Sequence, residues 1–281
     1  MAPRSGRHRL QGNPALGHGA TGRFAVYGIR YDEMAWRSDV PEDVRSEIET
    51  GSGAVMLTGM PLDDGNAALL LVAGQFGGVL TDGISFSSNP LEPGGVYRIE
   101  AKGDGVADDE GHLVYSTSPC FFPLHTDGYS ASVAPDILVL LCVRPDRQGG
   151  GGSLLAALDD VLPRLSQEEK ARLAEPVYPS LSGARRIVAD GEIRFNPMEV
   201  ARCRRLGFTP PPEENLAAHA RLNELFNSDG ILKQVHLTDG DCLIINNRRV
   251  VHGRHEYSPR GSRLLKRLWI QAPERGRPPC A

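Results

Sequence analysis

The distribution of apolar and polar residues predicts two helices near the start of the chain and many short strands after them. Segments 41–49 and 66–76 have helical spacing, and a proline followed by acidic residues opens the first. Residues 137–143 form an unbroken apolar run between Pro135 and Pro145, as expected for a buried strand. Similar short runs predict strands at 54–58, 96–100, 113–116, 153–158, 233–237, 242–246 and 264–271.

The second half of the chain contains further helix and turn signals. Helices are predicted at 162–174, where Ser166 and Glu169 have the spacing of a capping box, and at 213–226. An Asp-Gly pair at the centre of 185–195 predicts a hairpin. Together these elements indicate a mainly β protein with flanking α-helices and a double-stranded β-helix core, which is the jelly-roll of cupins.

Composition indicates one folded domain with a loose segment at each end. Of the 281 residues, 40% are hydrophobic and 23% are charged, which is ordinary for a globular protein. Residues 1–22 are rich in Gly and Arg and lack periodicity, so we expect a poorly ordered tail. Residues 273–281 predict a second loose tail. The domain, with its helical insertions, should therefore span 23–272.

Charge and hydropathy exclude several functions. The formal net charge is −4, and no basic stripe of the kind that binds nucleic acid is present. No apolar run approaches the roughly 20 residues that cross a bilayer, and no secretory signal is recognisable. The five cysteines are scattered without a CxxC pair, which favours reduced thiols. We expect a cytoplasmic protein, and no particular oligomeric state is indicated.

Candidate metal ligands occur in two distant segments. His125 and Asp127 are two residues apart, so on a strand both side chains would point to one face. His252 follows the predicted strand 242–246 in the segment Asn-Arg-Arg-Val-Val-His-Gly-Arg. Two histidines and one carboxylate form a facial triad, which leaves coordination positions open for a cosubstrate and O2 on iron(II). His255 is a competing candidate for the third ligand.

Two arginines near the C-terminus suggest an anionic ligand. Arg263 and Arg267 are four residues apart in a strand-like segment, so both can face the same side. A buried guanidinium requires an anionic partner, and its planar fork suits a carboxylate. The simpler alternative is a solvated basic face, which the interleaved apolar residues disfavour. A glycine run before Ser153 would let the backbone approach a ligand, although an ordinary turn explains it equally well.

The order of these motifs resembles the taurine dioxygenase superfamily, and within it the clavaminate synthase-like amino-acid hydroxylases. The resemblance covers residues 54–271 and is strongest in 123–158 and 238–271. It implies an Fe(II)/2-oxoglutarate-dependent dioxygenase that uses O2 as a second cosubstrate. It also implies roles for six residues: His125, Asp127 and His252 as iron ligands, Ser153 and Arg263 as partners of the distal carboxylate of 2-oxoglutarate, and Arg267 as a support for the cosubstrate or for an anionic group of the substrate.

Further expectations come from the same resemblance. Asn247 should support the metal-bearing strand, and an Asp at position 127 disfavours halogenation, because related halogenases have Gly or Ala there. The substrate should be a small molecule, an amino acid or a carboxylate-bearing derivative in secondary metabolism, free or bound to a carrier protein. The expected pocket rim comprises 86–89, Tyr97, Arg98, 117–122 and Tyr129.

Several alternatives remain open at this point. The same ligand set could hold catalytic zinc in a hydrolase, although no general base is evident and the two arginines would then lack a purpose. A non-catalytic cupin-like binding protein is the third possibility. Within the oxygenase hypothesis, hydroxylation competes with desaturation, cyclisation and epimerisation.

Overall fold

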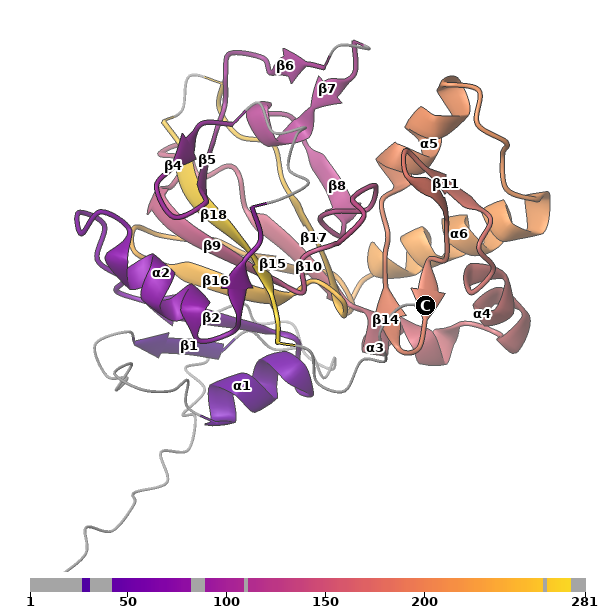
Figure 1. The fold of residues 1–281 in the computed structure, drawn as a ribbon, viewed down its shortest axis with the longest axis horizontal. Helices are drawn as coiled ribbons and strands as arrows, with labels where there is room; N and C mark the ends of the chain where they lie inside the picture. Colours follow the sequence, from indigo (N-terminus) through magenta and orange to yellow (C-terminus); the bar gives the residue numbers. More distant parts are fainter. Residues whose placement is uncertain (1–26, 31–41, 82–88, 109–110, 260–261, 274–281) are drawn as a thin grey trace, which may run out of the picture.

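The fold is built from two β-sheets with helices on both outer sides (Figure 1). The computed structural model describes residues 27–30, 42–81, 89–108, 111–259 and 262–273. The predicted N-terminal tail at 1–22 and nearly all of the predicted C-terminal tail lie outside these residues. Within the described part, the prediction of a mainly β jelly-roll with flanking helices is confirmed.

The larger sheet has eight strands. Seven run in the order β1-β2-β16-β9-β18-β5-β4, and β3 pairs with β18. Every pair is antiparallel except β1 with β2. The bounds are β1 Tyr27–Arg30, β2 Ala54–Thr58, β3 Gly78–Val79, β4 Leu91–Glu92, β5 Val96–Glu100, β9 Ile137–Arg144, β16 Cys242–Asn246 and β18 Leu264–Gln271.

The smaller sheet has four antiparallel strands in the order β15-β10-β17-β8. Their bounds are β8 Phe122–His125, β10 Ser153–Ala157, β15 Lys233–Val235 and β17 Val250–Arg254. Three short hairpins complete the β structure: β6 Val106–Ala107 with β7 Leu113–Val114, β11 Tyr178–Ser180 with β12 Gly183–Arg185, and β13 Val188–Ala189 with β14 Glu192–Ile193.

Alternation along the strands divides the apolar residues between three layers. Leu138 of the larger sheet and Leu155 of the smaller sheet belong to one cluster, which fills the space between the sheets. The next residues along, Val139 and Leu154, point the opposite way into two outer clusters. Because both faces of each sheet are covered, β9 from 137 to 143 and β10 from 154 to 157 are apolar without a break and do not alternate with polar residues.

Helices cover the two outer faces (Figure 1). Helices α1 (Glu42–Glu49) and α2 (Ala67–Gly74) pack on the larger sheet, and the outer face of the smaller sheet is covered by α3 (Leu158–Val161), α4 (Gln167–Leu173), α5 (Pro197–Arg205) and α6 (Glu213–Phe226). No helix among the described residues has the length and apolar character that crossing a bilayer requires.

Local predictions differ from the structure in three elements. The predicted helix at 162–174 is confirmed only in its second part, where the Ser166 capping box starts α4; the first part is a 3-10 turn (Leu162–Arg164), and Leu165 between them is extended. Helix α5 was not predicted, although Asn196 caps it and a proline opens its first turn. The predicted hairpin is shorter, with Asp190 and Gly191 at positive φ in its tip.

The pairing of β8 with β17 brings the two distant segments of candidate ligands together. His125 lies directly opposite His252, and the register shifts between His252 and Arg254. Gly253 makes this close approach possible, because a Cβ atom there would lie 2.6 Å from the carbonyl oxygen of Phe122. A β-carbon at this position would push the two strands apart.

We therefore predict that Gly253→Ala destabilises the fold by about 1–3 kcal/mol, as overpacking does elsewhere. Chemical denaturation measures the free energy of unfolding. Gly74→Ala is the matched control, because Gly74 has open space around its Cβ position and lies in the last turn of α2. Equal stability of the two variants would contradict the proposed steric role of Gly253.

Candidate active site

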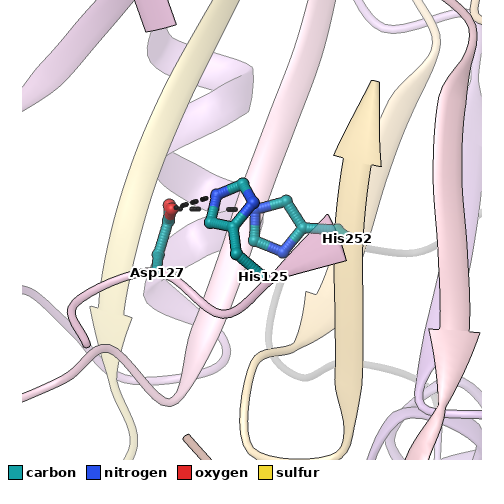
Figure 2. A group of neighbouring side chains, drawn as sticks. All are labelled: His125, Asp127 and His252. Carbon is teal, nitrogen blue, oxygen red and sulfur yellow. Dashed lines mark ion pairs between the residues drawn. The ribbon is translucent and has the colours of Figure 1, made fainter. Parts of the chain in front are cut away.

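Three side chains with metal-binding atoms converge between the sheets (Figure 2). His125 ends β8, Asp127 lies in the turn that follows, and His252 is in the middle of β17. Their ligand atoms all lie within 4.8 Å of one another. Two imidazole nitrogens and a carboxylate oxygen, all protected from bulk water, match the donor set that non-haem iron(II) prefers.

The orientations of the histidine rings suit this role. Nδ1 of His125 donates a hydrogen bond to the carbonyl oxygen of Pro123 at 2.9 Å, which orients the ring so that Nε2 faces the candidate metal position. Nε2 of His125 lies 3.3 Å from Oδ1 of Asp127, and Nε2 of His252 lies 3.7 Å from the same oxygen. Phe122 stacks on the His125 ring with centroids 4.1 Å apart, which further fixes the ring plane.

The two carboxylate oxygens of Asp127 have different surroundings. Oδ1 faces the histidines, whereas Oδ2 accepts hydrogen bonds from Nε1 of Trp269 at 2.6 Å and from Nη1 of Arg267 at 3.2 Å. Arg267 and Trp269 are two residues apart on β18, so they share one face of the strand. Only one oxygen is therefore directed at the candidate metal position.

Electrostatics favour the charge states that a metal needs. Burial alone would raise the pKa of Asp127, but the Arg267 guanidinium, together with the two adjacent histidines, holds that pKa well below its usual value. Burial, with the neighbouring His125, lowers the pKa of His252. A carboxylate that stays ionised, beside a His252 imidazole that resists protonation, favours binding of a divalent cation.

Asn247 holds the backbone around Asp127. Its Oδ1 accepts from the backbone N–H of Asp127 at 2.9 Å, and its Nδ2 donates to the carbonyl oxygens of Asp127 and Pro135 at 3.0 and 2.9 Å. Since β8 ends at His125, these bonds replace the strand pairing that Asp127 lacks. The expected supporting role of Asn247 matches this geometry, although Asp127 lies in a turn and not, as predicted, on the strand itself.

All six predicted site residues line one cavity, so Ser153, Arg263 and Arg267 share it with the three candidate ligands. Arg263 is only 5% exposed and forms no ion pair among the described residues. Gly151 lies against it: φ is +71°, and a Cβ atom there would lie 2.7 Å from Nε of Arg263. The glycine run thus makes room for this side chain. An unpaired buried guanidinium fits the carboxylate of 2-oxoglutarate, so the alternative of a solvated basic face is wrong for Arg263.

Arg254 and Tyr257 also belong to this region and were not predicted. Nη2 of Arg254 donates to the carbonyl oxygens of Ser118 and Cys120 at 2.7 and 2.6 Å. The ring of Tyr257 lies between the two guanidiniums, 4.6 Å from that of Arg254 and 5.2 Å from that of Arg263. Burial lowers the pKa of Arg254 to about 10, so the group stays charged at neutral pH.

The structure also decides between the competing sequence candidates. His255 lies beside Phe121, outside the ligand cluster, so His252 is the third member. Phe122 lines the cavity as predicted. Tyr129 does not, because its ring is buried in the cluster on the outer face of the smaller sheet and its hydroxyl donates to Pro179. The predicted rim residues 86–88 lie outside the described residues.

Comparison with known protein families identifies the class of enzyme. The family described as "Taurine catabolism dioxygenase TauD, TfdA family" matches residues 15–269. The chain belongs to the TauD/TfdA family. Membership confirms the predicted enzyme class, an Fe(II)/2-oxoglutarate-dependent dioxygenase, and sets aside both the zinc hydrolase and the non-catalytic binding protein.

Several relatives of this TauD/TfdA chain are known, and the names of some of them include the amino acid asparagine. Clavaminate synthase 2 of Streptomyces clavuligerus is 23% identical, with 90% of this chain and 86% of that protein aligned. L-asparagine oxygenase of Streptomyces coelicolor is 25% identical over 90% of this chain and 72% of that protein. A structure of asparagine oxygenase with Fe(II), 2S,3S-3-hydroxyasparagine and succinate superposes with a TM-score of 0.61, at 24% identity, over 84% of this chain and 81% of that one.

We predict that Asn247→Ala weakens metal binding about 10- to 100-fold, in the range seen when supporting contacts of metal ligands are removed. The physical reason is that Asp127 loses the bonds that fix its backbone. Isothermal titration with Mn(II) measures the affinity. Asn246→Ala is the matched control, because Asn246 bonds Ile48 and Arg248 and does not touch Asp127. Identical Mn(II) affinities in both variants would refute the supporting role.

Proposed function

We propose that this protein is a cytoplasmic oxygenase that hydroxylates an unactivated C–H bond of an amino acid or amino-acid derivative in secondary metabolism. The observation that carries the proposal is the convergence of His125, Asp127 and His252 beside the unpaired, buried Arg263. The first three would hold Fe(II), and the last would hold a cosubstrate with a free carboxylate. The named reactions of the related proteins support the choice of an amino-acid substrate.

The residues of the cavity divide the work among them. Arg263 and Ser153 bind the distal carboxylate of 2-oxoglutarate, and the rigid strand pairing of β10 with β17 holds Ser153 near the metal position. Arg267 steadies Asp127 and presents its remaining donors to an anionic group of the substrate. Iron bound here would use 2-oxoglutarate and O2 to insert one oxygen atom into the C–H bond, with succinate and CO2 as coproducts.

Apolar side chains of the larger sheet form the opposite wall of the cavity. They are Ile99, Leu138, Leu140 and Leu265. This wall excludes water, which strengthens the contacts of the charged groups facing it and limits side reactions of a strong oxidant. The protein thus binds and orients the reactants and excludes water, while the metal would supply the oxidation chemistry.

The direct test is a succinate-release screen with Fe(II), ascorbate, 2-oxoglutarate and air across free amino acids and carrier-bound aminoacyl groups. We expect one amino-acid class to stimulate succinate formation and to gain one oxygen atom by mass. His125→Ala and His252→Ala should abolish 2-oxoglutarate consumption, whereas His255→Ala should retain it. A product that has lost two hydrogens would indicate desaturation or cyclisation, and full activity of both ligand variants would overturn the site assignment.

A second prediction concerns the cosubstrate alone. Arg263→Ala should raise the KM for 2-oxoglutarate about 10- to 100-fold, because a hydrogen-bonded charge contributes about 1.5–3 kcal/mol. The metal affinity should stay the same. Arg205→Ala, which removes an exposed arginine of α5, serves as the control. If the KM for 2-oxoglutarate does not change in Arg263→Ala, another residue binds the distal carboxylate.

A further inference from the structure

The indole of Trp269 makes a contact that the proposed reaction does not yet explain. Its Nε1 donates to Oδ2 of Asp127 at 2.6 Å, the shorter of the two hydrogen bonds from β18 to that oxygen. A buried indole N–H needs one acceptor, and a backbone carbonyl is the common choice. Here the acceptor is the carboxylate whose other oxygen faces two imidazoles.

Trp269 is held rigidly. It is 9% exposed, lies in the apolar cluster between the sheets, and sits opposite Leu138 in the pairing of β18 with β9. Strand β18 has neighbours on both sides within the larger sheet, so its backbone cannot shift alone. The indole nitrogen is therefore a fixed point in the structure.

Arg267 is less suited to fix the same oxygen. Its side chain is long, lines the cavity, and keeps Nε without a hydrogen-bond partner. Because Nε is not hydrogen-bonded, the Arg267 guanidinium can reorient to bind a second anion in the cavity. Trp269 does not line the cavity, so its contact with Asp127 persists when the cavity fills.

We propose that Trp269 is a positioning residue that keeps Asp127 a one-oxygen ligand of the iron. The inference rests on the proposed function. A carboxylate can bind a metal through one oxygen or through both. With Oδ2 engaged by the indole, Asp127 cannot turn to offer both oxygens. The coordination positions that 2-oxoglutarate and O2 require therefore stay open.

The test compares Trp269→Phe, which removes the N–H and keeps an aromatic ring, with Trp269→His, which restores a ring N–H. Anaerobic titrations measure Mn(II) affinity, and then 2-oxoglutarate affinity of the Mn(II)-loaded protein. Trp269→Phe should lower the 2-oxoglutarate affinity of the Mn(II)-loaded protein about 10- to 100-fold, because an Asp127 that binds through both oxygens occupies a position that the cosubstrate needs. Trp269→His should recover part of the loss. Met56→Leu, in the same cluster but not among the residues that line the cavity, should match the wild type.

If a Trp269 variant does not fold, its affinities say nothing about the contact with Asp127. A second measurement therefore uses protein that retains Trp269. The chain has two tryptophans, so its indole ¹⁵N–H spectrum contains two signals, and Trp36→Phe identifies that of Trp269. Zn(II), a diamagnetic probe, should shift the Trp269 signal. If that signal does not move while the wild type binds metal, or if Trp269→Phe matches the wild type in 2-oxoglutarate affinity, the inference is wrong. A wild type that binds no metal would instead overturn the proposed function.

Discussion

The structure of the site depends on one buried negative charge. Asp127 is 7% exposed, and removing an ionised carboxylate from water costs several kcal/mol unless the surroundings replace its hydration. Here the replacement comes from side chains on three elements. The imidazoles of β8 and β17 face one oxygen, and a guanidinium and an indole from β18 bind the other. The two sheets are thus tied together at the point where the metal is proposed to bind.

Of the three arginines that line the cavity, only one forms an ion pair among the described residues. Arg267 is paired with Asp127, whereas Arg254 and Arg263 have no ion pair among the described residues and rest against the ring of Tyr257. Two buried guanidiniums without a direct ion pair among the described residues favour an anionic ligand, because the cost of burying them does not have to be met again when the ligand binds. The cavity is therefore organised for a dicarboxylate before it arrives.

The same two strands carry residues proposed for metal binding and for cosubstrate binding. Strand β17 carries His252 and Arg254, and its neighbour β10 carries Ser153 opposite Arg254. Because the strand pairing fixes these side chains relative to one another, small shifts in β17 would change the metal position and the cosubstrate position together. Gly253, which lets β17 approach β8, therefore supports the geometry of the site as well as the stability of the fold.

Much of the site was determined by the sequence itself. The two-residue period of a strand predicted that Arg263 and Arg267 share one face and that His125 and Asp127 point one way. Both pairs do line the cavity, although Arg263 lies just before β18 and Asp127 lies in a turn. The same period could have revealed Trp269, two residues beyond Arg267. Strand periodicity is a local property of the backbone, so it can be recognised in the sequence without knowing which segments pack together in the fold.

Tertiary structure decided the rest. Which face of β18 meets the smaller sheet depends on how the two sheets stack, and only that stacking gives Trp269 a carboxylate instead of a carbonyl partner. Tyr129 was expected at the pocket and lies on the far side, because the positive φ of Gly128 turns the chain away after Asp127. Contacts across 120 or more residues, such as Asn247 with Asp127, follow from the packing of the folded chain and leave no periodic signal in the sequence.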